Sequence, residues 1–193
     1  MRTKYLAIAT NNKNIGKLGK EIKIMLMITY KSLYFKKLSS FNTVQIYDGA
    51  EFSKDDIPKI GKTCLILLSQ SGETKDLHRC IEIAKDNNLM TIGVVNVVDS
   101  LIARDVQCGV YLNAGKEVAV ASTKAFTSQS IVLNLIAIWF AQNKNMNEMK
   151  RMELIKNLRN VPYDIKKVIE QNNEDCIKVA NYLKDHDTIF VLG

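Results

Sequence analysis

The residues best suited to chemistry in this chain of 193 residues are the hydroxyl and amide side chains of the segment SQSGET, which begins at Ser69. Ser69, Ser71 and Thr74 carry hydroxyls and Gln70 carries an amide, all of which can donate hydrogen bonds to anionic oxygens. Gly72 permits a sharp turn and leaves space for a ligand. A helix is expected directly after the segment, so its amino-terminal N–H groups would also favour an anion. The pattern fits a phosphate-binding loop, and an ordinary serine-rich turn before a helix is the alternative.

A second loop of small and hydroxyl residues, NAGKEVAVASTK, runs from Asn113 to Lys124. It follows a short expected strand and ends where a long apolar helix should begin, with Ser122 or Thr123 as the helix cap. Lys124 could neutralise an anion or be solvated. Small residues before a helix are common caps, so this loop alone indicates little about function.

Apolar runs that alternate with amphipathic stretches should position these loops. Strands are expected at 43–47, 63–68, 91–98 and 110–112, and helices at 74–87, 100–104 and about 122–142. The run Thr63–Leu68 is apolar throughout, which is typical of a central strand buried on both faces. In the first helix Leu77, Ile81 and Ala84 share one side. The alternation predicts an α/β fold: a doubly wound, mostly parallel sheet with helices on both faces, and ligands beyond the carboxyl ends of its strands.

The last fifty residues differ from this pattern. Helices are expected at 145–157, 162–170 and 174–184, with the first break at Asn160–Val161–Pro162 because proline disfavours a helix before it. Thr188–Gly193 (TIFVLG) is expected to begin a new buried strand. The tail therefore predicts a helical linker and the start of a second, truncated domain.

The composition is that of a folded domain. Hydrophobic residues make up 47% of the chain and charged residues 24%, which is enough for a buried core. The four cysteines form no CxxC pair and only two histidines are present, so no metal site is expected. Cys64, in an apolar run, and Cys80, on a helix face, are expected to be buried free thiols. Unpaired cysteines of this kind favour a reducing, cytoplasmic location.

Excess positive charge is confined to the start of the chain. Residues 1–37 contain nine Lys or Arg and one Glu, whereas residues 38–193 contain eighteen basic and nineteen acidic residues. The body is near neutral and scattered lysines usually form a solvated face, so no nucleic-acid partner is expected. No signal peptide opens the chain, and the most apolar segment, Ile131–Ala141, is shorter than the roughly 20 residues that span a bilayer. No membrane partner is expected either.

Three segments together resemble the sugar isomerase (SIS) signature of the glutamine–fructose-6-phosphate aminotransferase (isomerising) family. They are SQSGET, the stretch GVVNVVDS that contains Asn96, and NAGKEVAVASTKAFT, in the family's order and spacing. DGAEF, RNVPYDIKKVIEQ and TIFVLG extend the similarity over about residues 34–193. The resemblance implies a flavodoxin-like or Rossmann-like SIS domain at 34–144. A helical linker and the first strand of a second SIS domain would follow at 145–193, and a divergent basic segment would occupy 1–33.

The resemblance also implies a ligand, a hexose 6-phosphate, and a role in hexosamine biosynthesis. Its phosphate would be held by Ser69, Gln70, Ser71 and Thr74, and its sugar would be lined by Val120 and Ser122. The family opens fructose 6-phosphate, adds ammonia at the C2 carbonyl and isomerises the product to glucosamine 6-phosphate. It uses no metal and no organic cofactor, so none is expected here.

The chain departs from the family pattern in three places. The family's Cys-Gly-Thr-Ser loop has no counterpart in the corresponding stretch, Ile24–Lys31, although Tyr5–Thr10 could supply a replacement strand and Thr10–Asn12 a polar loop. The family's enolising Glu, ring-opening His and Schiff-base Lys map onto no residue here, so no catalytic residue is expected. Position 2 is Arg, where the family's glutaminase domain has its nucleophilic Cys.

Three hypotheses fit these motifs. The chain is part of an aminotransferase, as a fragment or as one piece of a split protein; it is a non-catalytic sugar-phosphate sensor or regulatory module; or it is a degenerate fragment. The motif ASTKAFT favours aminotransferase ancestry, and the unmatched acid–base residues favour binding without turnover by this chain alone. A homodimer, or association with a missing second half, is the expected assembly.

Overall fold

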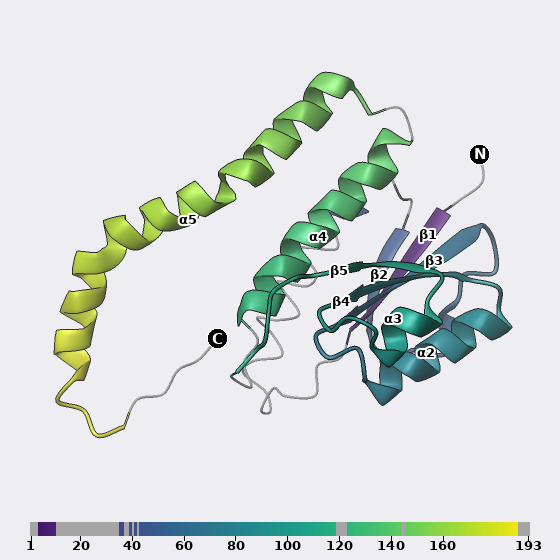
Figure 1. Ribbon diagram of the computed structural model, residues 1–193, viewed down its shortest axis with the longest axis horizontal. Coiled ribbons are helices and arrows are strands. Elements are labelled where there is room, and N and C mark those ends of the chain that lie inside the picture. The colour runs from purple at the N-terminus through teal and green to yellow at the C-terminus, as the bar shows by residue number, and fades with distance from the viewer. Residues whose placement is uncertain are drawn as a thin grey trace. The chain divides into compact units, whose positions relative to one another are not determined.

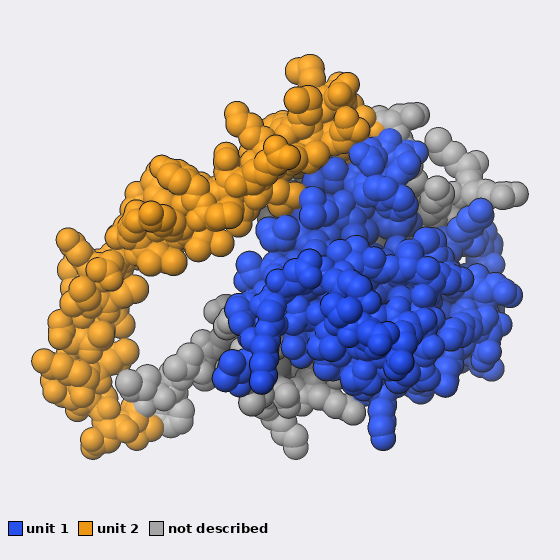
Figure 2. Space-filling model, viewed as in Figure 1, with its two compact units in different colours: residues 1–144 blue, residues 145–193 orange. Residues whose placement is uncertain are grey.

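The computed structural model describes residues 4–10, 35–36, 39, 41, 43–118, 123–143 and 146–188. The chain divides into two compact units, Met1–Lys144 and Asn145–Gly193, which Figure 2 shows in blue and orange. The first unit contains the sheet and the second contains one long helix. The predicted extents of the SIS domain and of the linker remain predictions.

The first unit is built on a five-stranded sheet in which every neighbouring pair of strands is parallel (Figure 1). The strands are β1 (Lys4–Thr10), β2 (Thr43–Asp48), β3 (Lys62–Ser69), β4 (Met90–Val95) and β5 (Cys108–Tyr111). Their order across the sheet is β2-β1-β3-β4-β5, so β3 is central. The doubly wound parallel sheet with Thr63–Leu68 at its centre is therefore confirmed.

Strand β1 corresponds to the replacement strand that was considered at Tyr5–Thr10. It lies between β2 and β3, with Tyr5 opposite Thr43 on one side and Thr63 on the other. The stretch Ile24–Lys31 and the polar residues that follow Thr10 lie outside the described residues. Strand β1 therefore lies between the edge strand β2 and the central strand β3.

Helices flank both faces of the sheet. The connections contain the short 3-10 helix η1 (Lys54–Asp56) and the helices α2 (Lys75–Asp86), α3 (Leu101–Asp105) and α4 (Thr123–Gln142). Helices α2 and α3 lie on one side of the sheet and α4 lies on the other (Figure 1). Helices α2 and α3 join β3 to β4 and β4 to β5, two steps in the same direction across the sheet, and right-handed crossovers place both helices on one face.

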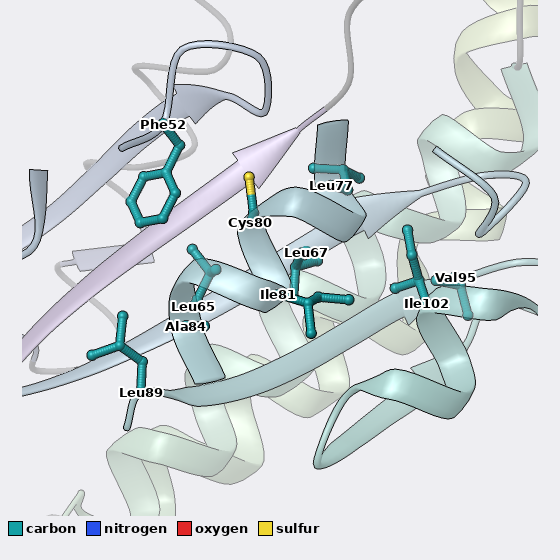
Figure 3. Packing of buried hydrophobic residues seen from close by; sticks show 10 residues of the cluster. All are labelled: Phe52, Leu65, Leu67, Leu77, Cys80, Ile81, Ala84, Leu89, Val95 and Ile102. Atoms are coloured by element: carbon teal, nitrogen blue, oxygen red, sulfur yellow. The ribbon is translucent and has the colours of Figure 1, made fainter. Parts of the chain in front are cut away.

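The main core lies between β3 and α2 (Figure 3). Its buried residues are Phe52, Leu65, Leu67, Leu77, Cys80, Ile81, Ala84, Leu89, Val95 and Ile102. Leu65 and Leu67 lie on the α2 side, and the alternate residue Ile66 is fully buried as well. Both faces of β3 are covered, which explains its unbroken apolar run.

Two of the four cysteines are buried in this unit, as expected from their sequence context. Cys64 and Cys80 are free buried thiols, while Cys108 and Cys176 are exposed. Burial raises the pKa of the Cys64 thiol to about 12 and that of the Cys80 thiol to about 11. Both thiols are therefore protonated and unreactive at neutral pH.

Helix α4 buries one side and exposes another. Ala137 and Ala141 are buried, and the ring of Phe140 packs edge-on against Phe41 with centroids 4.8 Å apart, while Trp139 is half exposed. Its segment Lys124–Gln142 has the length and composition of a membrane-crossing helix, and about a third of it is buried. Core helices of water-soluble proteins share these properties, so the expectation of no membrane partner stays untested.

The tail forms one helix, α5 (Glu148–Leu183), where three were predicted. Asn147 caps it by accepting a hydrogen bond from the N–H of Met149 (2.8 Å). Pro162 lies inside the helix and does not end it. Proline removes one backbone donor and crowds one carbonyl, which a helix can accommodate by bending, and α5 is visibly curved in Figure 1. The predicted break at 171–173 contains neither Gly nor Pro, so nothing forces it, and 189–193 lie outside the described residues.

Candidate functional site: loops at the carboxyl end of the sheet

The four predicted phosphate-binding residues lie together in the loop Ser69–Thr74, here called the phosphate loop. Ser69 is the last residue of β3 and Thr74 is the N-cap of α2. Because all five strands are parallel, this loop shares the carboxyl edge of the sheet with the residues that follow β4 and β5. It follows the central strand and immediately precedes the amino terminus of a twelve-residue helix.

Short-range hydrogen bonds shape the phosphate loop. The Ser69 hydroxyl, nearly buried, accepts a bond from the N–H of Gly72 (2.9 Å), and the Ser71 hydroxyl accepts one from the N–H of Glu73 (3.2 Å). The Oγ atom of Ser69 also lies 3.4 Å from Oγ1 of Thr74. A hydroxyl that accepts a backbone bond keeps its own hydrogen as a donor. The loop thus gathers hydroxyl donors at one point, beside a helix terminus that favours negative charge.

Gly72 is required by the shape of the loop. Its φ is +70°, a left-handed conformation that residues with a Cβ rarely adopt. A Cβ at this position would lie 2.0 Å from the Oγ of Ser100, so a side chain could not fit without movement of the loop. The sequence pattern predicted the turn at Gly72. The close approach of Ser100 to Gly72 is visible only in the structure.

Helix α3 supports the phosphate loop from the side. Its N–H groups at Leu101 and Ile102 donate to the Glu73 carboxylate and to the Gly72 carbonyl, both at 2.9 Å. At its other end Asp105 lies 2.6 Å from His78 of α2, measured between Oδ2 and Nε2. Hydrogen bonds therefore join α3 both to the phosphate loop and to α2. Glu73 was not among the predicted site residues, because its partner is distant in sequence.

Of the second loop, residues 113–124, the structure describes 113–118 and the last two residues, which begin α4. The two predicted sugar-lining residues, Val120 and Ser122, lie outside the described residues. Towards α4 the loop is held by the Glu117 carboxylate, which accepts from the N–H of Ala125 (2.9 Å). Lys124 donates to the carbonyl of Lys116 (2.8 Å). The Lys124 ammonium is therefore engaged within the loop, and was predicted either to face an anion or to be solvated.

The hydroxyls of the phosphate loop provide uncharged hydrogen-bond donors at this edge. The loop's one charged side chain, Glu73, accepts a bond from the Leu101 N–H. Across the part of the chain that the structure describes, no three His, Cys, Asp or Glu side chains gather as metal ligands would. The Ser100 hydroxyl is buried and has no hydrogen-bond partner among the described residues. The arrangement is suited to holding an anionic oxygen group rather than to proton transfer.

A known domain family matches the part of the chain that contains the sheet's strands β2 to β5 and both loops. Residues 30–139 match the SIS domain, which covers more than half of the chain and includes both loops. The chain belongs to the SIS domain family. The family resemblance and the fold expected from the sequence are both confirmed.

Two curated relatives of this SIS domain carry the name of glutamine–fructose-6-phosphate aminotransferase. A mimivirus protein named "Probable glutamine--fructose-6-phosphate aminotransferase [isomerizing]" is 42% identical over 160 residues, covering 83% of this chain and 26% of the relative. A human protein named glutamine–fructose-6-phosphate aminotransferase (isomerizing) 2 is 37% identical over 150 residues, covering 78% and 22%. The chain therefore spans about a quarter of the length of these curated relatives.

Solved structures share the fold of this SIS domain. The C-terminal domain of glucosamine–fructose-6-phosphate aminotransferase from Francisella tularensis superposes with a TM-score of 0.75 at 20% identity, covering 95% of this chain and 49% of that one. Glucosamine-6-phosphate deaminase from Thermotoga maritima gives a TM-score of 0.56 at 21% identity, covering 79% and 44%. At such identities the similarity establishes the fold.

Proposed function

We propose that this SIS domain binds a hexose 6-phosphate at the carboxyl edge of its sheet, with Ser69, Gln70, Ser71 and Thr74 holding the phosphate. The observation that carries the proposal is the phosphate loop itself. Its hydroxyls lie together at the end of the central strand, and Ser69 and Thr74 approach within 3.4 Å. Charge-assisted hydrogen bonds from several such donors, together with the α2 terminus, would hold a phosphate without a metal.

The proposed ligand is fructose 6-phosphate or glucosamine 6-phosphate, in hexosamine biosynthesis. The support comes from the names of the curated relatives, which are aminotransferases rather than regulators. That makes a part of an aminotransferase the better hypothesis than a sensor module. The described residues contribute binding, and Val120 and Ser122 are proposed to line the sugar. A reaction that aminates and isomerises the sugar would need acid–base groups, and the proposed binding residues include none.

Titration calorimetry of the chain with fructose 6-phosphate tests the binding proposal. Loss of one charge-assisted hydrogen bond corresponds to about 1.5–3 kcal/mol, so Ser71→Ala and Thr74→Ala should each weaken binding by about ten- to a hundredfold. Ser130→Ala is the matched control, because its hydroxyl donates to the Phe126 carbonyl within α4. Equal affinities in all four proteins would remove the phosphate-loop assignment. With added ammonia, the isolated chain should form no glucosamine 6-phosphate.

A further inference from the structure

Asn96 connects the two loops that the proposed function brings to one ligand. It directly follows β4, and its backbone N–H donates to the carbonyl of Gln70 in the phosphate loop (3.2 Å). Its side chain bonds to the second loop. Oδ1 accepts a hydrogen bond from the N–H of Ala114 (2.9 Å), and Nδ2 donates to the carbonyl of Gly115 (2.8 Å). One residue thus touches the phosphate loop through its backbone and the second loop through its side chain.

The second loop is shaped to meet this amide. The N–H of Leu112 still pairs with the carbonyl of Val95 (2.8 Å), so the chain leaves β5 beside the end of β4. It then turns through two left-handed residues, Asn113 with φ +50° and Gly115 with φ +69°. Those turns present one N–H and one carbonyl to Asn96. A side-chain amide can satisfy both because it carries a donor and an acceptor, whereas a carboxylate only accepts.

We propose that Asn96 is a positioning residue that sets the distance between the phosphate loop and the second loop. With the two loops held together, a hexose phosphate can contact both at once. The inference rests on the proposed function, and it adds a residue for which neither the predicted site nor the loop motifs give a role. A positioning role also predicts that different ligands respond differently to a change at Asn96, whereas a general structural role would affect all ligands alike. A ligand that touches only the phosphate loop should be insensitive to Asn96, and a ligand that touches both loops should depend on it.

Two ligands separate these cases. Inorganic phosphate is small enough to occupy only the phosphate loop, while fructose 6-phosphate extends its sugar towards the second loop. Asn96→Asp keeps the size of the side chain and the acceptor for Ala114, but it sets an oxygen against the Gly115 carbonyl. Asn96→Ala removes both side-chain bonds. Asn172→Asp on α5 is the matched control, because the Asn172 amide donates to the Val168 carbonyl of its own helix.

The experiment is calorimetric titration of wild type and the three variants with each ligand, after thermal unfolding has shown that they are folded. We expect both Asn96 variants to bind fructose 6-phosphate about ten- to a hundredfold more weakly, as for one or two lost hydrogen bonds. The Asn96→Ala variant should bind inorganic phosphate within about twofold of wild type, which would show that its phosphate loop is intact. The Asn96→Asp variant adds a negative charge that repels either anion, so its loss of affinity should be larger for fructose 6-phosphate than for inorganic phosphate. The Asn172→Asp variant should match wild type with both ligands.

The possible failures are distinguishable. If wild type binds both ligands and Asn96→Asp weakens both equally, or neither, Asn96 has no positioning role and the proposed function stands. If wild type binds neither ligand, the proposed function is wrong and this inference falls with it. An Asn96→Ala variant that does not fold leaves the isosteric Asn96→Asp variant to decide.

Discussion

Gly72 and Gly115 have the same backbone conformation in two different surroundings. Their φ angles are +70° and +69°. A Cβ on Gly72 would lie 2.0 Å from the Oγ of Ser100, whereas a Cβ on Gly115 would meet no atom of the described residues within 4 Å. Alanine at Gly115 therefore introduces only backbone strain, and alanine at Gly72 adds a steric clash. The pair separates two physical effects that usually occur together.

Gly115→Ala should lower the free energy of unfolding by about 1–2 kcal/mol, the cost of a left-handed residue with a Cβ. Gly72→Ala should lower it by about 1–3 kcal/mol more, as for an overpacked core site. Urea unfolding of both variants measures the difference. Ser100→Gly, introduced together with Gly72→Ala, should recover the steric part. Equal losses at the two glycines would mean that the phosphate loop moves away from α3 without resistance.

At the residue scale, the site residues that could be predicted from the sequence are those whose hydrogen-bond partners are close to them in the chain. Ser69, Ser71 and Thr74 were predicted from their hydroxyls and from the SQSGET motif, and their hydrogen-bonding contacts in the structure lie within the phosphate loop, two to five residues apart. The bonds of Glu73 to Leu101 and of Asn96 to Ala114 join residues 28 and 18 positions apart. Such pairings appear only when adjacent strands end at the same edge, so no motif could indicate them.

At the scale of elements, Pro162 is the residue at which prediction and structure differ most. An α-helix pairs each N–H with the carbonyl four residues earlier, so proline removes the bond that the Leu158 carbonyl would accept. Pro162 is exposed, and its replacement therefore loses no packing. Pro162→Ala should stabilise the middle of α5 by up to about 3 kcal/mol.

Hydrogen exchange at backbone amides of α5 measures this effect. In the Pro162→Ala variant, amides around residue 162 should exchange more slowly than in wild type. Val161→Ala is the control, since it changes helix propensity by no more than about 0.7 kcal/mol and removes no proline. Unchanged exchange in Pro162→Ala would show that α5 is held by something other than its own hydrogen bonds.

Elements with a clear hydrophobic period were predictable and others were not. The unbroken apolar run of β3 and the spacing of Leu77, Ile81 and Ala84 in α2 both follow from burial in the core. In α5 none of the described residues is buried, so periodicity offered no information and the proline was given too much weight. Strand β1 could only be considered as a possibility, because its partners β2 and β3 come more than thirty positions later in the chain.

For the whole molecule, the contrast between the two units predicts the course of limited proteolysis. Helix α5 carries many Lys and Arg residues and none of its described residues is buried, so its local opening should require little free energy. Of the tryptic sites in the described residues, those within α5 should therefore be cleaved first. Helix α2 also offers basic residues, Lys75, Arg79 and Lys85, but it buries Leu77 and Ile81. It should resist cleavage until the first unit unfolds.

Mass spectrometry of a tryptic time course provides the measurement. The first long-lived fragment should retain strands β2 to β5 and end near the start of α5. Sites in α2 serve as the internal control for global unfolding. Protection of α5 for as long as α2 would indicate that its exposed apolar residues, such as Tyr163 and Ile169, are covered in solution, for example by self-association.

The position of β1 has a consequence for aggregation. Strand β2 is joined to the sheet only through β1, and β1 also covers one side of β3. While Lys4–Thr10 is unpaired, β2 has no strand partner, and β3 presents an unpaired row of backbone N–H and carbonyl groups on its β1 side. Such an edge is a template for pairing between chains. The seven residues of β1 therefore protect the chain against aggregation. When β1 pairs with β2 and β3, the edge of β3 is no longer available for pairing with a strand of a neighbouring molecule.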